Sequence, residues 1–237
     1  MRSGDNTIIV VRDQKVGVPT KDVIAGTLLP QNIVLSDAQI AQVQLYIGTL
    51  VFWNDRISLT AVSDPFEILA RHFAESFLGA AELPEAIGKR LVDVGSGPGF
   101  PGVALKIVRP SLHVHLVEQN AKKAAFLSEI VRTLELPNVH VHRTSYESLS
   151  PEVGRFDFVT SRALGEYKKL LKWSAERLER SDGTVVLWLG VEEANKLSRE
   201  IGWSWKKTVL IPGSRQRVIL VGAPTAESLV SSRKQGR

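Results

Sequence analysis

Four glycines and one carboxylate crowd a short stretch of this chain. Residues 91–102 read Leu-Val-Asp-Val-Gly-Ser-Gly-Pro-Gly-Phe-Pro-Gly. The first residues have the pattern of a strand and a helical pattern follows the glycines, so we expect a strand, a tight turn and a helix. Glycine lets a backbone turn sharply and approach a ligand closely. The stretch therefore predicts a small-molecule site at the carboxyl end of a strand in an open α/β sheet.

Two classes of cofactor compete for this loop. Gly97-x-Gly99-x-x-Gly102 fits the dinucleotide fingerprint, which favours nicotinamide or flavin nucleotides. However, Pro98 and Pro101 lack the backbone N–H groups that a pyrophosphate needs. Asp93 would repel a phosphate but attract a cation. S-adenosylmethionine is cationic at sulfur and carries no phosphate, and the loop resembles motif I of class I methyltransferases. We therefore expect S-adenosylmethionine as the cofactor, bound near Asp93, Gly95 and Gly97.

Further polar side chains follow the next predicted strands. Glu118 ends the second strand about 20 residues after the glycine loop, where a carboxylate can accept both ribose hydroxyls. Tyr146 and Glu147 follow the third strand and could flank an adenine. Arg162 leaves the fourth strand and could hold the cofactor or a substrate phosphate. Because parallel strands end at one edge of a sheet, these side chains are expected to meet there.

Strand and helix patterns alternate from Leu91 onward, which predicts a doubly wound, mostly parallel α/β sheet. Strands are expected at 91–95, 113–118, 138–143, 156–160, 184–189, 203–211 and 216–222. Only Pro212-Gly213-Ser214-Arg215 separates the last two, too few residues for a crossover helix, so this pair should be an antiparallel hairpin. The whole resembles the seven-stranded, Rossmann-like fold of class I methyltransferases.

The chain before the sheet divides into two parts. Residues 1–35 show no sustained period and are expected to form a partly ordered arm. Residues 36–90 are expected to form a helical cap, with one helix from Ser36 to Asn54 and another from Asp64-Pro65 to Leu78. The methyltransferase domain should span 91–222, and the polar residues 223–237 should be a disordered tail.

Composition narrows the possible functions. The 237 residues include no cysteine, which excludes disulfides, thiolate zinc sites and a cysteine nucleophile. No apolar run is long enough to span a membrane, so we expect a cytoplasmic protein with no membrane partner. The charge of +5 permits a polyanionic partner without requiring one. Four histidines alternate on two neighbouring strands without a carboxylate cluster, and we expect no metal: His113, His115, His140 and His142.

The residues that are absent restrict the reaction. Methylation of a pyrimidine carbon needs a cysteine, and the Asn/Asp-Pro-Pro-aromatic run that accompanies exocyclic amine methylation is replaced by Ser161-Arg162-Ala163-Leu164. Guanine N7 offers an in-plane lone pair and has no proton to lose. Its methylation needs positioning rather than a general base, and we expect no catalytic dyad.

Residues 36–222 resemble the bacterial small-subunit ribosomal RNA methyltransferase G family, also called glucose-inhibited division protein B. The resemblance rests on these segments: Trp53-Asn54, Leu59-Thr60-Ala61, His72 with Glu75-Ser76, 93–102, Lys122-Lys123 with Phe126-Leu127, 161–163 and Ile211-Pro-Gly-Ser-Arg215-x-Arg217. It implies methylation of N7 of one guanine in 16S rRNA, on the small subunit or its assembling RNA, by an enzyme that we expect to be a monomer. By position it implies cofactor contacts from Gly95, Phe100, Glu118, Tyr146, Glu147 and Arg162.

Two positions depart from the family pattern: Leu189 replaces a usual lysine and Ser58 replaces a usual asparagine. We expect Lys168 to take over the missing positive charge, with His72 and Arg162 as further substrate contacts. Three alternatives remain open at this point. They are a methyltransferase of the same fold with another RNA or small-molecule substrate, a nicotinamide dehydrogenase, and a cofactor-binding RNA-binding protein without turnover.

Overall fold

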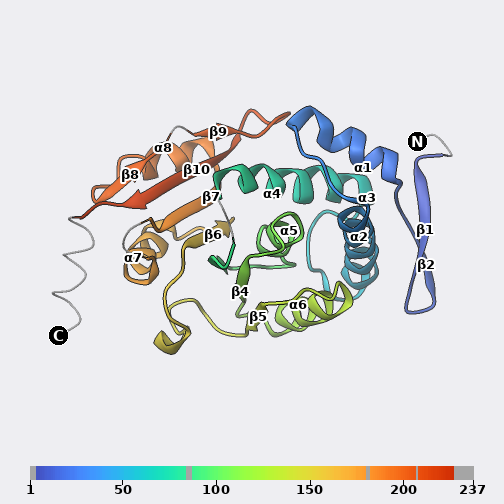
Figure 1. Cartoon of the computed structure of the whole chain (residues 1–237), viewed down its shortest axis with the longest axis horizontal. Coiled ribbons are helices and arrows are strands. Elements are labelled where there is room, and N and C mark those ends of the chain that lie inside the picture. The colour runs from blue at the N-terminus through green and yellow to red at the C-terminus, as the bar shows by residue number, and fades with distance from the viewer. Residues whose placement is uncertain (1–3, 84–86, 180–181, 207, 227–237) are drawn as a thin grey trace.

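A central sheet dominates the computed structural model, which describes residues 4–83, 87–179, 182–206 and 208–226 (Figure 1). Its strand order is β5-β4-β3-β6-β7-β10-β8, and β9 also pairs with β10. Five strands are mutually parallel: β3 (Arg90–Val94), β4 (His113–Val117), β5 (Val139–His142), β6 (Phe158–Arg162) and β7 (Thr184–Gly190). The predicted doubly wound, mostly parallel sheet is confirmed. Because the chain runs outward in both directions from β3 and β6, their carboxyl ends form the switch point at which such sheets bind ligands.

The last part of the sheet differs from the prediction in one respect. Strand β10 (Arg217–Pro224) is antiparallel to the segments that precede it, which confirms the expected antiparallel pair, and it is also antiparallel to β7. The single strand expected at 203–211 is divided into β8 (Trp203–Trp205) and β9 (Val209–Leu210), so the sheet has eight strands. Both short strands pair with β10, but Val209 is opposite Ile219 while Trp205 is opposite Gly222. The register of the two short strands against β10 therefore differs by one residue.

Apolar residues alternate along the strands and fill two cores, one on each face of the sheet. Leu91 packs with α5 (Gly102–Val108) and α6 (Ala121–Thr133), on the face that the N-terminal helices also cover. Val92 and Val94 point the other way, into the core formed with α7 (Tyr167–Arg177) and α8 (Val191–Leu197). No helix within the described ranges is long and apolar enough to cross a membrane.

The helical cap begins as predicted. Ser36 caps α2 (Asp37–Ile57) in a capping box with Gln39. Asp64 then caps α3 (Pro65–Ile68), which continues through a π-helical segment η2 (Leu69–Ala74) into α4 (Glu75–Leu78) and the 3₁₀ turn η3 (Gly79–Glu82). The periodicity of the sequence predicts one continuous helix here and gives no sign of the π-helical turns, which often occur at functional sites.

The N-terminal residues are more ordered than the sequence predicts. A hairpin of β1 (Asn6–Val11) and β2 (Gln14–Pro19) packs against α2, at one end of the molecule in Figure 1, followed by α1 (Lys21–Leu28) and the turn η1 (Leu29–Gln31). Its two turn residues, Arg12 and Asp13, have φ angles of 47° and 66°. A two-residue turn of this kind usually contains glycine or asparagine, so the sequence lacks the ordinary hairpin signal. The predicted disordered tail lies, from residue 227, outside the described residues.

Replacing Gly79 with alanine should loosen the contact between cap and sheet. A Cβ atom at Gly79 would collide with the buried indole of Trp188, whose Nε1 donates to the Glu75 carbonyl at 2.7 Å. Overpacking of this kind costs about 1–3 kcal/mol of unfolding free energy, measurable by urea titration. Gly26→Ala is the matched control, because Gly26 lies on exposed α1 with open space around its Cβ position. Equal stabilities for the two variants would contradict this account of the packing.

Candidate functional site

The glycine loop between β3 and α5 turns where side chains would not fit. Gly99 has a φ of 103°, and a Cβ atom there would collide with the Tyr46 hydroxyl. At Gly102 a Cβ atom would lie 2.7 Å from the Cβ of Asp93, on the strand beneath. The loop is therefore packed tightly between β3 and the cap, and glycine is needed at both positions.

Asp93 holds this loop from below. Its side chain is fully buried, with Oδ2 accepting from the Gly102 backbone N–H at 3.0 Å and Oδ1 accepting from the Thr160 hydroxyl at 2.9 Å. Burial raises the pKa of the Asp93 carboxyl to about 6, and the hydrogen bonds from Thr160 and Gly102 oppose that rise. The structure thus places Asp93 under the loop and not among the side chains that line the adjoining cavity.

Phe100 also supports the loop from within the protein. Its buried ring stacks on Tyr46 of α2, with centroids 5.1 Å apart and planes 7° from parallel. The Tyr46 hydroxyl donates to the Pro98 carbonyl at 2.5 Å. Sequence reasoning missed this role of Tyr46, because its position on α2 follows the helical period of an ordinary core residue.

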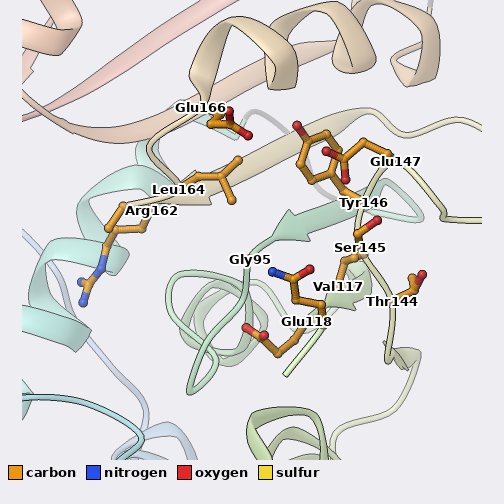
Figure 2. Close-up of a pocket in the computed structure, with 12 residues that line it drawn as sticks. Gly95, Val117, Glu118, Thr144, Ser145, Tyr146, Glu147, Arg162, Leu164 and Glu166 are labelled. Atoms are coloured by element: carbon orange, nitrogen blue, oxygen red, sulfur yellow. The ribbon is translucent and has the colours of Figure 1, made fainter. Parts of the chain in front are cut away.

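A cavity of about 380 Å³ opens beside the loop at the carboxyl ends of the parallel strands (Figure 2). The structure brings together five of the predicted cofactor-binding residues in its wall: Gly95, Glu118, Tyr146, Glu147 and Arg162. The remaining three predicted residues, Asp93, Gly97 and Phe100, do not line this cavity. The volume lies in the range of sites for small molecules and cofactors.

Glu118 is the carboxylate of this cavity. Its Oε1 accepts from the Asn120 backbone N–H at 2.7 Å and its Oε2 accepts from the Gly97 backbone N–H at 2.9 Å. A carboxylate offers about four acceptor positions, so each oxygen retains one for a ligand hydroxyl. Two donors thus fix the group, which faces the cavity ready to accept two further hydrogen bonds. On the opposite wall, burial raises the pKa of the Tyr146 phenol to about 12, which keeps it protonated.

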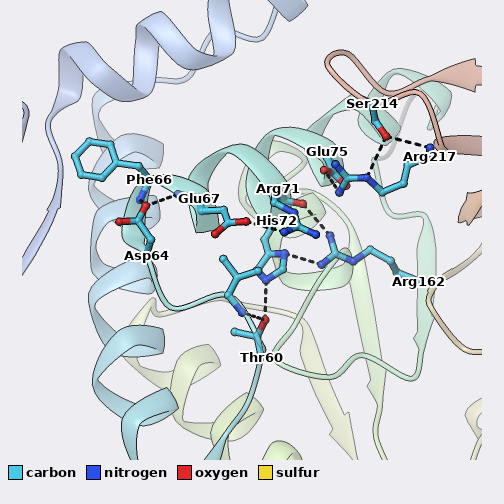
Figure 3. A network of polar contacts seen from close by, with 11 residues as sticks. Thr60, Asp64, Phe66, Glu67, Arg71, His72, Glu75, Arg162, Ser214 and Arg217 are labelled. Carbon is cyan, nitrogen blue, oxygen red and sulfur yellow. Dashed lines mark hydrogen bonds and ion pairs between the residues drawn. The ribbon is translucent and has the colours of Figure 1, made fainter. Parts of the chain in front are cut away.

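Arg162 marks the other end of the cavity. Figure 2 shows its guanidinium turned away from Glu118 and Tyr146. Nη2 donates to His72 Nδ1 at 2.6 Å and Nη1 donates to the Arg71 carbonyl at 3.1 Å (Figure 3). Because an arginine can only donate, Nδ1 of His72 accepts, and its Nε2 carries the proton toward the Thr60 hydroxyl 3.0 Å away. The π-helical segment therefore positions Arg162 through one neutral imidazole and one backbone carbonyl.

The neutral state of His72 should be visible in the pH dependence of stability. Burial, followed by the charge of Arg162, lowers the pKa of His72 from 6.5 to about 3. The pKa of His72 is therefore lower in the folded state than in the unfolded state. The neutral ring contributes its full stability above pH 6.5, and this contribution is lost as the pH falls toward 3.

Replacing His72 with glutamine removes that titration. The variant should unfold more easily at pH 7, and its deficit relative to wild type should shrink by about 2 kcal/mol between pH 7 and pH 5. Urea unfolding at the two pH values measures the change. A deficit that is the same at both values would show that His72 titrates normally in the folded protein.

A second cavity, of about 410 Å³, adjoins the first one. Arg162 and Ala163 line both. The other residues of the second wall come from the cap, α7, β7, β10 and the loops before α7 and after β9: Arg71, Glu75, Gly165, Tyr167, Trp188, Leu189, Gly190, Ile211 and Arg217. Sequence reasoning did not single out Glu75, Trp188 or Arg217 as a site, because they are distant along the chain.

Lys168 is not part of either cavity wall. It is exposed on α7, where its amine lies 2.6 Å from the Glu200 carboxylate. Leu189, by contrast, lines the second cavity, so the family's usual lysine position does belong to this site. The positive charges of the second cavity wall are those of Arg71, Arg162 and Arg217.

The predicted histidine group forms a stack rather than a ligand set. The His115 ring lies 5.0 Å from His140 and 5.2 Å from His142, and His115 Nδ1 is 3.0 Å from His142 Nε2. Among the residues that the structure describes, no group of three or more His, Cys, Asp or Glu side chains is arranged to hold a metal ion.

Among solved structures, magnesium protoporphyrin IX methyltransferase from Synechocystis PCC 6803 with bound SAM has a TM-score of 0.58 and 16% identity, and covers 82% of this chain and 100% of its own. The ribosomal protein L11 methylase of Lactobacillus delbrueckii has a TM-score of 0.56 and 15% identity, covering 66% of this chain and 79% of its own. These likenesses confirm the class I methyltransferase fold.

Proteins related by sequence have higher identity to this chain. The ribosomal RNA small subunit methyltransferase G of Roseiflexus sp. is 35% identical over 221 residues, covering 89% of this chain and 94% of the relative. The protein of the same name from Chromobacterium violaceum is 37% identical over 182 residues, covering 76% of this chain and 85% of the relative. The family model GidB, described as rRNA small subunit methyltransferase G, matches residues 39–214. The chain therefore belongs to the rRNA small subunit methyltransferase G family.

Proposed function

We propose that this protein transfers a methyl group from S-adenosylmethionine to N7 of a guanine in 16S rRNA. The observation that carries the proposal is the pair of cavities that meet at Arg162 and Ala163. One cavity contains the acceptors that an adenosine needs. The other is lined by two aromatic residues, Tyr167 and Trp188, and by the ion pair of Glu75 and Arg217. Methyl transfer requires two ligands side by side, which adjoining cavities can hold.

The residues of the first cavity fit S-adenosylmethionine, which supplies a methyl group on a positively charged sulfur. Glu118 would accept hydrogen bonds from the two ribose hydroxyls with the acceptor positions that Gly97 and Asn120 leave available. Tyr146 and Glu147 would flank and bind the adenine. His72 and the Arg71 carbonyl hold the Arg162 cation toward the cap, which limits its repulsion of the sulfonium.

The second cavity would hold the target base for an in-line reaction. The N7 lone pair forms the bond to the methyl carbon as the carbon–sulfur bond breaks, and the positive charge passes from sulfur to the purine. N7 has no proton to lose, so the protein needs to align the two ligands and exclude water. Both ring nitrogens of the neutral His72 are hydrogen-bonded, to Arg162 and to Thr60, which agrees with a reaction that needs no general base.

The substrate form and assembly are also part of the proposal. A net charge of +5 and the three arginines of the second cavity favour an anionic RNA chain as the partner. We expect the protein to act as a cytoplasmic monomer on the small subunit or its assembling RNA.

Labelled methyl transfer tests the proposed function. The protein is incubated with labelled S-adenosylmethionine and either deproteinised 16S rRNA or small subunits that lack the modification, and the labelled base is mapped. Label on N7 of one guanine is the expected result. Transfer to neither substrate, with S-adenosylhomocysteine still bound, would leave a cofactor-binding protein and overturn the proposed substrate. Binding of NAD in its place would restore the dehydrogenase alternative.

A further inference from the structure

An ion pair between Glu75 and Arg217 forms part of the wall of the second cavity. The Glu75 side chain, on α4, is 7% exposed and the Arg217 side chain is 38% exposed, and Glu75 Oε1 lies 2.5 Å from Nη1 of Arg217 (Figure 3). Burial raises the pKa of the Glu75 carboxyl, and the charges of Arg217, Arg162 and Arg71 oppose this rise. An ion pair with one buried partner is weak evidence of a stabilising role, because desolvation of the carboxylate offsets much of the attraction. Its place in the wall of a cavity suggests another role.

Both partners are fixed independently of each other. Arg217 starts β10, opposite Gly190 of β7, and its Nε donates to the Ser214 hydroxyl at 3.2 Å. The backbone of Glu75 is held by Trp188, whose Nε1 donates to the Glu75 carbonyl. The carboxylate and the guanidinium are thus placed side by side by the cap and by the sheet. Aromatic surface from Tyr167 and Trp188 completes the same cavity.

Recognition of N7 alone would not select a guanine, because adenine carries the same nitrogen in the same ring. The two purines differ at the six-membered ring. Guanine presents an acceptor at O6 and donors at N1 and N2, whereas adenine presents a donor at N6 and an acceptor at N1. Proteins that act on an extruded base commonly read this edge by hydrogen bonds and stack the ring on aromatic side chains. An arginine beside a carboxylate offers donors next to acceptors, in the order that guanine requires.

We infer that Glu75 and Arg217 select the target base: the Glu75 carboxylate accepts from N1–H and the N2 amino group of guanine, while Arg217 donates to O6. This inference rests on the proposed function. Adenine in the same position would place its N6 amino group against the guanidinium and its N1 lone pair against the carboxylate. The pair leaves N7 uncontacted, and this atom lies on the edge of the purine opposite N2.

Inosine tests this assignment, because it is a guanosine without the N2 amino group and keeps O6, N1–H and N7. The target guanine is first mapped with the wild-type protein, and 16S rRNA is then ligated with guanosine or inosine at that position. Loss of one hydrogen bond to a charged acceptor should lower kcat/KM of wild type roughly 10- to 100-fold for inosine. In Glu75→Gln the preference for guanosine should fall below about threefold, since the neutral amide has one acceptor oxygen in place of two and places an NH₂ donor beside the N1 and N2 donors of guanine.

Glu82→Gln is the matched control. Glu82 follows Glu75 in the cap, on η3, but lines neither cavity, and its variant should keep the full preference for guanosine. S-adenosylhomocysteine binding should stay within about threefold of wild type in both variants, which separates base reading from cofactor binding. If Glu75→Gln does not fold, the double variant Glu75→Gln/Arg217→Met removes the uncompensated charge and should show the same loss of preference.

The possible outcomes separate this inference from the proposed function. Methylation of guanine N7 by wild type, with an equal guanosine preference in wild type and Glu75→Gln, would overturn the role of Glu75 alone. A wild-type protein that methylates no guanine N7 would overturn the proposed function, and the base-reading role with it.

Discussion

Replacement of Glu118 with alanine should weaken S-adenosylhomocysteine binding by about 100-fold or more. The two carboxylate oxygens face the first cavity, each with an acceptor position left for a ribose hydroxyl. A hydrogen bond to a charged group contributes about 1.5–3 kcal/mol, and two such bonds would be lost. Methyl transfer at subsaturating cofactor should fall by the same factor. Isothermal titration calorimetry measures the affinity directly.

Part of the lost affinity would come from a change in the glycine loop and not from the missing ribose contacts. The variant also removes the acceptors of the Gly97 and Asn120 backbone N–H groups. Glu118→Gln helps to divide the effect, because its amide keeps one acceptor oxygen and should bind more tightly than the alanine variant. Glu176→Ala, at an exposed position on α7, is the matched control and should bind like wild type. Unchanged affinity in Glu118→Ala would rule out this carboxylate as the ribose contact.

The fold could be predicted largely because local patterns agree with it. Apolar alternation marks the parallel strands, and the glycine spacing marks the loop at the end of β3. Features without a local signal were missed. Arg12 and Asp13 form a tight turn with positive φ angles despite their side chains, and the one-residue change of register between β8 and β9 is decided by pairing with β10.

The candidate site likewise contains residues that the sequence could place and residues that it could not. Residues at the carboxyl ends of strands, such as Glu118 and Arg162, could be placed from the sequence because parallel strands end at one edge. The wall of the second cavity could not, since Glu75 and Arg217 meet across 142 positions of the chain. The burial of Asp93 beneath the loop depends on Thr160 of the neighbouring strand, a contact that the glycine motif does not reveal. Tertiary packing, not local pattern, decides these positions.

Replacement of Arg162 with methionine should reduce kcat/KM for RNA methylation by about 100-fold. The side chain stands where the two cavities meet, and two hydrogen bonds to His72 and Arg71 fix its charge. Loss of a charge-assisted contact to substrate costs about 1.5–3 kcal/mol, and loss of the fixed geometry between the two ligands adds to it. S-adenosylhomocysteine binding should change less than tenfold, because the guanidinium points away from Glu118 and Tyr146 (Figure 2). Kinetics with 16S rRNA measure kcat/KM, and calorimetry measures the affinity for S-adenosylhomocysteine.

The same variant has a second, independent readout. Arg162 is one of the charges that lower the pKa of His72, so its removal should raise that pKa from about 3, although burial will keep it below 6.5. An NMR titration of His72 measures the change. Arg199→Met, at an exposed position that lines neither cavity, should alter neither the kinetics nor the titration. A raised His72 pKa with undiminished methylation would show that Arg162 stabilises the cap and contributes nothing to the alignment of the two ligands.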